Sequence, residues 1–192
     1  ALAPSILFML TSFTRIIIVL HFVRAAIGTQ TVPPNQVLIG LALFLTLFIM
    51  SPVFTQINEN ALKPLDAGEI TQEQAFEAGM EPIREFMFKQ TQAKDNNTFC
   101  DIAGVTYETQ DDISNTVLIP SFILSELRQA FIIGFVIYIP FIVIDMVVAS
   151  VLMSMGMMML PPTTISLPFK ILLFVLADGW NLVIRELVET FY

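Results

Sequence analysis

The sequence is poor in the residues from which most metal sites and many catalytic sites are built. Among its 192 residues it has one cysteine, Cys100, and one histidine, His21. A single cysteine excludes an internal disulfide bond, and a single histidine argues against a histidine-based metal site or catalytic dyad within one chain. We therefore expect neither a bound metal ion nor a cofactor.

Charge is also scarce. Only 14% of the residues are charged and 55% are hydrophobic, whereas about a quarter of the residues are charged in an average soluble domain. This composition predicts a membrane protein, or a subunit that partners cover on many sides. The formal net charge of −8 argues against binding to nucleic acid and against a basic patch that would hold the chain on a membrane surface.

Long apolar runs are what the sequence has in abundance. Each is long enough for the roughly 20 residues with which a helix crosses a bilayer, and they cover about residues 4–27, 36–54, 131–155 and 165–188. Short links containing the doublets Pro33-Pro34 and Pro161-Pro162 join them in pairs, which predicts two helical hairpins.

We therefore expect an all-α fold with a single domain over residues 1–192. Its parts would be an apolar hairpin at about 4–54, a polar helical region at about 55–120, and a second apolar hairpin at about 121–190.

The polar region carries its own helix signals. Thr71 and Gln74 form a T-x-x-Q capping box, which predicts a helix beginning there. Pro82 should kink that helix or begin a second one that continues towards Lys94. Residues 95–116 are polar and read as a loop, after which a helix from about Ser121 leads into the third apolar run.

Four charges lie in the interior of the apolar runs, away from their ends, where a charge facing lipid is costly. They are Arg15, Asp145, Lys170 and Asp178. Either they pair inside the bundle of one chain, or other subunits cover them, and their spread over three runs favours the second arrangement. Catalysis by an Asp145–Asp178 pair is the weaker hypothesis, because neither aspartate has a recognisable catalytic context and structural pairing to Arg15 or Lys170 explains them better.

Glu126 and Arg128 lie just before the third run. Two residues apart on a helix, they face different sides and cannot pair well with each other. Each must find a different partner, either in a neighbouring subunit or in solvent, and the spacing leaves both open.

The stretch MSMGMMMLPP, residues 153–162, holds five methionines. Gly156 permits a break in the helix and the two prolines force the next turn, so we expect Met157, Met158 and Met159 at the tip of the second hairpin. Unbranched, polarizable thioethers can fill an irregular gap and move aside.

Several blocks together resemble the FliP family of flagellar export-gate proteins, called SctR in the related injectisomes. They are LTSFTRIIIV at 10–19, PPNQVLIGLALFLTLFIMSP at 33–52, SELRQAFIIGF at 125–135 and the segment 144–180. The long acidic middle region is closer to the flagellar branch. The family usually has a cleavable signal peptide and a further apolar start, so we expect a mature protein less some N-terminal residues.

The resemblance implies a non-enzymatic core subunit of a helical ring assembly. In the family, five FliP copies and one FliR form a closed helical stack, with FliQ and FlhB as further partners. Unfolded flagellar proteins pass through its centre. The assembly would lie at the bacterial inner membrane in the flagellar basal body, in contact with lipid, with much of it facing the periplasm. The alternatives are a generic four-pass channel or transporter and an injectisome export subunit.

The resemblance also implies roles for particular residues. Met157, Met158 and Met159 correspond to a methionine gasket that closes the channel. Phe86 and Phe99 correspond to aromatic positions that line the pore. Glu126 and Arg128 fall on a motif where contacts between neighbouring subunits are expected.

Overall fold

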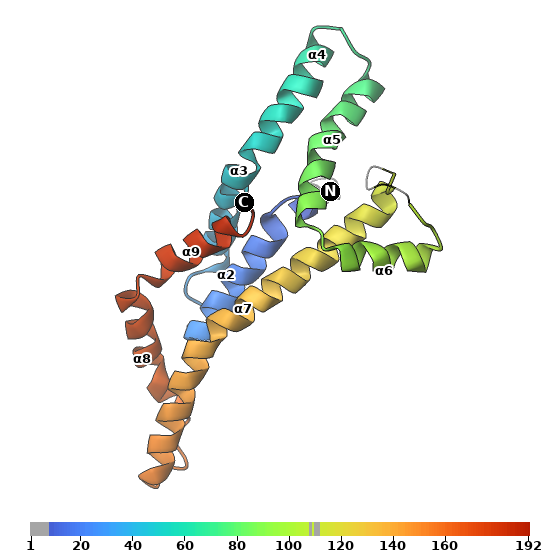
Figure 1. Ribbon diagram of the computed structural model, residues 1–192. Coiled ribbons are helices and arrows are strands. Elements are labelled where there is room, and N and C mark those ends of the chain that lie inside the picture. Colours follow the sequence, from blue (N-terminus) through green and yellow to red (C-terminus); the bar gives the residue numbers. More distant parts are fainter. Residues whose placement is uncertain (1–7, 108, 110–111) are drawn as a thin grey trace. The chain divides into compact units, whose positions relative to one another are not determined.

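The computed structural model describes residues 8–107, 109 and 112–192, and within them every regular element is helical (Figure 1). The predicted all-α fold is therefore confirmed. The elements are α2 (Phe13–Ile27), α3 (Asn35–Ile57), the π-helical turn η1 (Asn58–Leu62), α4 (Lys63–Asp66), α5 (Gln72–Gln90), α6 (Ala93–Ala103), α7 (Asn115–Ser154), α8 (Pro162–Leu176) and α9 (Gly179–Glu189).

The chain forms two compact units, and each is built from two separate segments. Unit 1 consists of Ala1–Arg15 and Leu43–Gln129, and unit 2 of Ile16–Ala42 and Ala130–Tyr192. Helices α2, α3 and α7 each contribute residues to both units. The units are described separately below.

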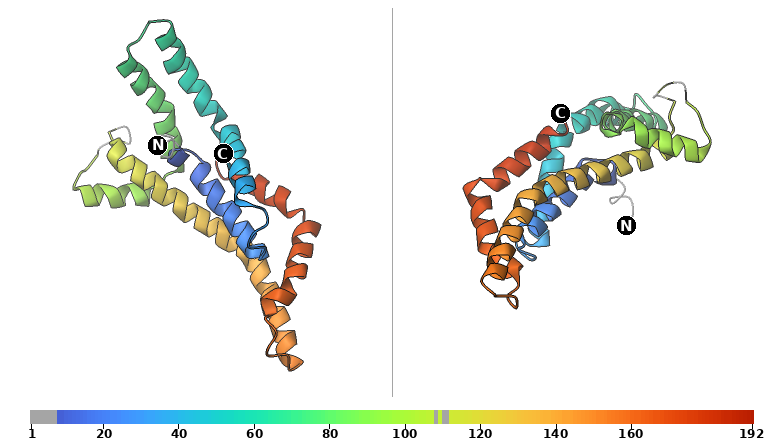
Figure 2. Two further views of the ribbon diagram at one scale, coloured as in Figure 1. Left: turned by 180° about the vertical axis from the view of Figure 1, so that it is seen from behind. Right: turned by 60° about the horizontal axis from the view of Figure 1, so that its bottom comes forward.

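In unit 1, α5 folds back beside η1 and α4, as the views from both sides show (Figure 2). Small residues allow this close packing: a Cβ added to Gly79 would lie 3.4 Å from the Cβ of Ala61. The predicted capping box begins α5, because Thr71 Oγ1 accepts from the Gln74 backbone N–H while Gln74 Oε1 accepts from that of Thr71. Pro82 lies inside α5, which continues to Gln90. Of the two alternatives for Pro82, a second helix beginning there is therefore wrong, and a kink stays a prediction.

Helix α6 contradicts the prediction of a loop over residues 95–116, which is wrong for its first half. Its inward face carries Asp95 and Asn96, both buried, so polar contacts rather than an apolar stripe hold it in place. The helix ends at Gly104, whose left-handed φ of 66° turns the chain. The backbone N–H of Val105 then bonds to Cys100 O at 3.1 Å.

Helix α7 joins the end of the polar region and the third apolar run into one helix of 40 residues. In unit 2, α8 runs back beside the last turns of α7, which confirms the predicted second hairpin (Figures 1 and 2). The core of this unit contains the buried residues Val23, Ala26, Ile27, Phe141 and Phe174.

The fourth apolar run is broken rather than continuous. Helices α8 and α9 meet at a bend of 64°, and Asp178 between them has a left-handed φ of 49°. Gly179 lies so close to the Phe174 ring that a Cβ there would overlap it. The Phe174 and Trp180 rings then pack edge to face with centroids 5.3 Å apart. The bend follows from this packing.

The structure also bears on the number of possible membrane spans. In the described residues, two helical segments are long and apolar enough to cross a membrane, Asn35–Asp66 and Asn115–Ser154. The bent α8–α9 pair gives a third if it is counted as one span. Helix α2 has 15 residues, fewer than the roughly 20 that a span needs, but the first run begins at about residue 4, outside the described residues, so a span over the whole run stays a prediction.

Candidate functional site

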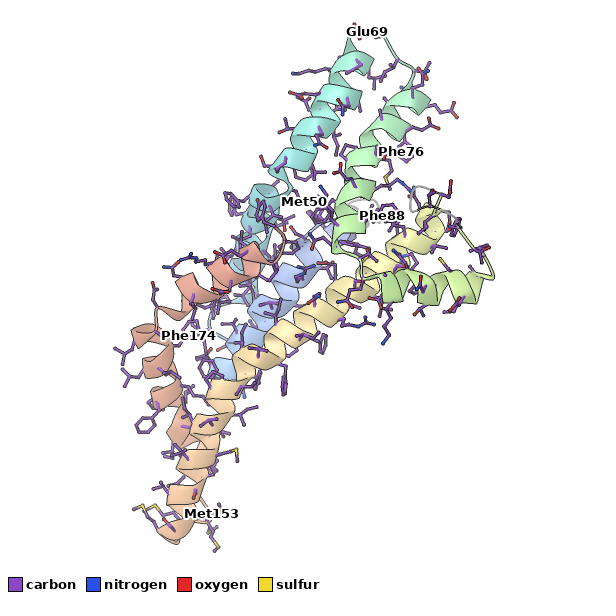
Figure 3. The ribbon with its side chains drawn as sticks, in the orientation of Figure 1. Met50, Glu69, Phe76, Phe88, Met153 and Phe174 are labelled. Atoms are coloured by element: carbon purple, nitrogen blue, oxygen red, sulfur yellow. The ribbon has the colours of Figure 1, made fainter. Side chains whose placement is uncertain are left out.

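The methionine stretch lies at the tip of the α7–α8 hairpin, as predicted (Figure 3). Helix α7 is closed by a Schellman motif, in which Gly156 has φ 73° and its N–H bonds to Met153 O at 3.1 Å. The Met157 N–H reaches Leu152 O at 3.0 Å. Pro162 then occupies the first position of α8, where its missing N–H costs nothing. Both ends of the loop are therefore fixed by local chemistry.

The methionine side chains of this loop are exposed. The exposed fraction rises from 41% at Met157 to 83% at Met158 and 97% at Met159. Met153 and Met155 are exposed as well. Three consecutive exposed thioethers are a poor arrangement for a core, because none of them removes much apolar surface from water within this chain.

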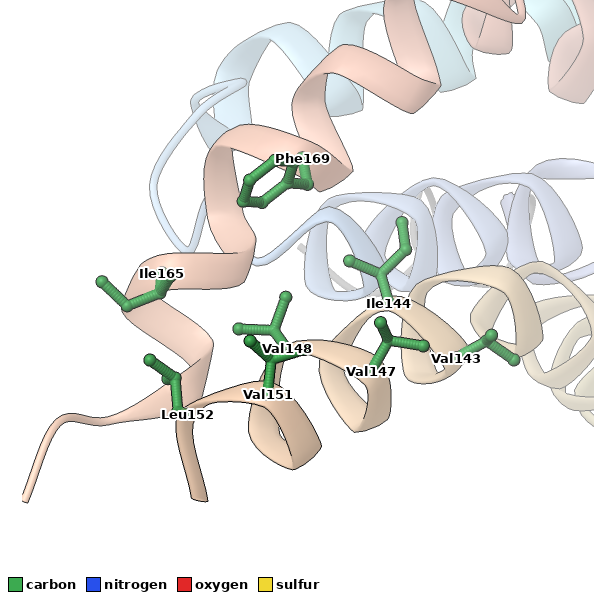
Figure 4. A pocket seen from close by; sticks show the side chains of 8 residues that line it. All are labelled: Val143, Ile144, Val147, Val148, Val151, Leu152, Ile165 and Phe169. Atoms are coloured by element: carbon green, nitrogen blue, oxygen red, sulfur yellow. The ribbon is translucent and has the colours of Figure 1, made fainter. Parts of the chain in front are cut away.

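Above the loop, α7 and α8 enclose an apolar groove within unit 2 (Figure 4). It has a volume of about 490 Å³ and is lined by residues such as Val147, Val151, Ile165 and Phe169. No polar atom is exposed in the groove, so it offers dispersion contacts and nothing for hydrogen bonding or catalysis.

The two aromatic residues predicted to line a pore have different surroundings. Phe86, on α5, is buried in unit 1 and packs edge to face against Phe122 of α7, with ring centroids 6.0 Å apart. Phe99, on α6, is half-buried. The pore-lining role of both residues stays a prediction, and in this chain Phe86 serves the core of unit 1.

Arg15 and Glu126 form a buried ion pair inside unit 1. The Arg15 side chain is 3% exposed and that of Glu126 is 0% exposed. The guanidinium donates to both carboxylate oxygens, through Nε to Oε2 at 3.1 Å and through Nη2 to Oε1, and Nη2 also donates to Gln90 Oε1 at 3.0 Å. This bidentate geometry is the one that compensates best for burying two charges.

Arg128 is paired within the same unit. Its guanidinium bonds to Asp95 with an Nη2–Oδ1 distance of 2.6 Å and also donates to Gln92 Oε1 at 3.0 Å. Ser125 Oγ donates to Asp95 Oδ2 at 2.6 Å, so this network ties the start of α6 to α7. Glu126 and Arg128 do have different partners, as their spacing predicted, and these partners lie in the same chain. A further contact with a neighbouring subunit stays a prediction.

In unit 2, Lys170 of α8 pairs with Asp145 of α7 at 2.6 Å. Ser166 Oγ also donates to Asp145, at 2.5 Å. The Lys170 side chain is 7% exposed and that of Asp145 is 29% exposed. The predicted structural pairing of Asp145 to Lys170 is thus confirmed.

Asp178 differs from the other charges in the apolar runs because it is exposed. Its carboxylate accepts a hydrogen bond from Asn181 Nδ2 at 3.0 Å. Asp145 is engaged by Lys170 and Ser166, so the two aspartates have separate partners and do not share a proton in this structure. A catalytic pair of carboxylates requires two side chains that share one proton, and the separate partners of Asp145 and Asp178 do not fit that arrangement.

Several polar residues of these networks escaped the sequence analysis, namely Gln90, Gln92, Asp95, Ser125 and Ser166. Only the spacing of Ser125 and Arg128, one helical turn apart, could have suggested a shared partner. Asp95 and Ser125 are 30 residues apart, and nothing local in the sequence connects them.

Comparison with known proteins gives a consistent result over nearly the whole chain. Residues 1–187 match the FliP family. The flagellar biosynthetic protein FliP of Bacillus subtilis is 58% identical over 192 residues, which is all of this chain and 87% of that protein. The flagellar biosynthetic protein FliP of Pectobacterium carotovorum is 53% identical, with 98% of this chain and 74% of that protein covered. The chain therefore belongs to the FliP family.

Proposed function

We propose that this chain is a core channel subunit of the flagellar type III export gate, and that it acts by forming and sealing a pore rather than by catalysis. Five copies would assemble with FliR and FliQ, with FlhB associated, in the bacterial inner membrane and with much of the assembly facing the periplasm. Unfolded flagellar proteins would be the cargo. Residues 1–192 would act as one FliP-like domain within it.

The exposed methionine loop is the observation that carries this proposal. Met158 and Met159 are largely exposed in the single chain although their side chains are apolar. The hydrogen bonds that close α7 at Gly156 and the proline that begins α8 fix the two ends of their loop. If several copies place this loop around one axis, their side chains bury one another. A thioether has flexible torsions and no branching, so such a ring can close on itself and yield to a passing chain.

Arg15 and Lys170 pair within the chain, with Glu126 and Asp145, so the expectation that other subunits cover these charges is not what their contacts show. The pairing is compatible with a multi-subunit assembly, because the apolar helices can meet neighbours without unpaired charge at these positions. Large apolar side chains on α7, among them Phe131, Phe135 and Val143, remain more than half exposed. They provide surface that lipid or further subunits can cover.

Replacing all three methionines of the loop by alanine tests the seal. The variant Met157→Ala/Met158→Ala/Met159→Ala should assemble normally, because side chains that are exposed in the chain contribute little to its folding. We expect increased leakage of ions or small solutes across the inner membrane. The measurement is solute flux into vesicles that contain the purified complex.

Met146→Ala is the matched control, because Met146 is 66% exposed on α7 and lies away from the tip. It should leave both assembly and leakage unchanged. A triple variant that is as tight as wild type would contradict the seal. Native mass spectrometry of the complex separates the main alternative: a monomer with solute-dependent flux would favour a generic transporter, while a multi-copy ring containing FliQ and FliR favours the export gate.

A further inference from the structure

A second cleft in unit 2 has a chemistry unlike that of the apolar groove. It has a volume of about 750 Å³ and lies where the end of α2 and the first link approach α7 and the beginning of α8. Its wall carries two cationic side chains, an imidazole ring and three hydroxyl groups, which belong to Arg24, Lys170, His21, Tyr138, Thr163 and Thr164. The wall also contains Asp145, the carboxylate already engaged by Lys170 and Ser166.

Arg24 is the cation of this cleft that has no acidic partner among the described residues. Its Nη1 donates to Pro33 O at 3.1 Å and to Asn35 Oδ1 at 2.6 Å, and its Nη2 lies 3.0 Å from His21 Nδ1. All three acceptors are uncharged. A guanidinium has five N–H donors, so two remain after these bonds. Lys170 and Asp145 cancel, which leaves the cleft with a net charge of about +1 from Arg24.

Helix α8 adds donors on the opposite wall. Pro162 has no N–H and the Thr164 N–H bonds to Pro161 O at 3.2 Å, so the start of α8 offers the backbone N–H of Thr163 and the positive end of the helix dipole. Thr163 and Thr164 of this first turn are exposed and line the cleft, so their hydroxyl groups are available as well. Arg24 lies in the last turn of α2, where its positive charge also stabilises the carbonyl end of that helix. That role alone does not explain why Arg24 and the two threonines line the same cleft.

We propose that this cleft binds a phosphate group, held by Arg24 on one side and by Thr163 and Thr164 with the α8 N-terminus on the other. An anionic phospholipid headgroup or free inorganic phosphate could supply it. The exposed apolar side chains of α7 and α8 provide surface that the acyl chains of such a lipid can cover. The lining of the cleft contains none of Met157, Met158 and Met159, which precede α8 in the sequence.

The test uses the full chain in its complex, purified in mild detergent, with bound lipid measured by native mass spectrometry. The probes are phosphatidylglycerol and inorganic phosphate. Wild type should retain phosphatidylglycerol, and Arg24→Gln should lower its affinity at least about tenfold, the usual effect of losing a hydrogen bond to a charged group. Arg185→Gln is the matched control: Arg185 is an exposed arginine of unit 2 that pairs with Glu189, and its loss should change nothing.

A second variant, Thr163→Val/Thr164→Val, tests the same site if Arg24→Gln does not fold. Both threonines are exposed, so their replacement should leave the fold intact. This variant should weaken lipid binding several-fold. If inorganic phosphate displaces phosphatidylglycerol from the wild-type complex, the cleft binds phosphate groups in general and free phosphate is a ligand of the same site. Unchanged phosphatidylglycerol binding in the folded variants would overturn the proposal. So would the absence of binding by both probes, or a loss of subunit assembly without any change in bound lipid, which would assign Arg24 to a protein contact.

Discussion

The two parts of α7 differ in composition and in burial, and the less apolar part is the one that the chain buries: the first part carries Glu126 and Arg128, whereas the second part is almost entirely apolar. In unit 1, its first part buries Leu118, Phe122 and Glu126 completely. In unit 2, its second part leaves Phe135 63% exposed and Met146 66% exposed. The first part is fixed by contacts within the chain. In the second part, large apolar side chains are exposed in the single chain. Hydrophobicity alone therefore does not tell which part of a helix forms the core of the chain and which part forms a surface for lipid or other subunits.

Among the changes that test this difference between the two parts of α7, removing one partner of a buried ion pair should reduce the stability of the chain most. Arg15→Ala leaves Glu126 of the first part buried and unpaired, which should cost about 3–5 kcal/mol of stability. Lys170→Ala leaves Asp145 of the second part, whose side chain is 29% exposed, so we expect a smaller loss of about 1–3 kcal/mol. Thermal unfolding of the full chain in detergent, followed by circular dichroism, measures both.

Arg185→Ala serves as the control for these variants, because its pair with Glu189 is exposed. Equal losses from Arg15→Ala and Lys170→Ala would show that the two parts of α7 do not differ in this way. A normal yield of assembled complex from both variants would show that neither charge is buried.

Phenylalanine truncation sharpens the comparison on the apolar side. Phe122→Ala removes a fully buried ring that contacts Phe86, and it should cost about 3 kcal/mol, at the low end for such changes. Phe135→Ala removes a mostly exposed ring and should cost below about 0.5 kcal/mol in the free chain. Unfolding of the dissociated chain measures both, and the yield of the complex then shows whether Phe135 matters only after assembly. A large loss from Phe135→Ala in the free chain would contradict the distinction.

Gly134 lies just inside the second part of α7, and its replacement should have a smaller effect than the loss of Arg15 or of the Phe122 ring. A Cβ at this position would overlap the Phe22 ring, so Gly134→Ala forces that ring to move and should cost about 1–2 kcal/mol. Gly40→Ala is the control, because nothing lies within 4 Å of a Cβ there. The unfolding assay applies again, and Phe22→Ala should relieve the penalty in the double variant. If Gly134→Ala is neutral, α2 does not pack closely against α7 at this point.

Much of the local structure could be predicted from neighbouring residues. The capping box at Thr71 and Gln74 begins α5, and Gly156 with Pro162 places the methionines on a loop. Such signals act within one turn of helix, where the sequence itself brings donor and acceptor together. The family assignment also followed from contiguous blocks of sequence, and the comparisons confirm it.

The sequence by itself therefore determined the all-α class, the apolar helices, the second hairpin and its methionine tip. Only the tertiary structure decided that Arg15 pairs with Glu126, 111 residues away, and that α6 is held by the buried Asp95. It also decided the break at Asp178, where α8 and α9 meet at a bend of 64° and Gly179 packs closely against the Phe174 ring. The physical reason is the range of each interaction: helix signals act between near neighbours, whereas the partner of a buried charge depends on which distant segments fold together.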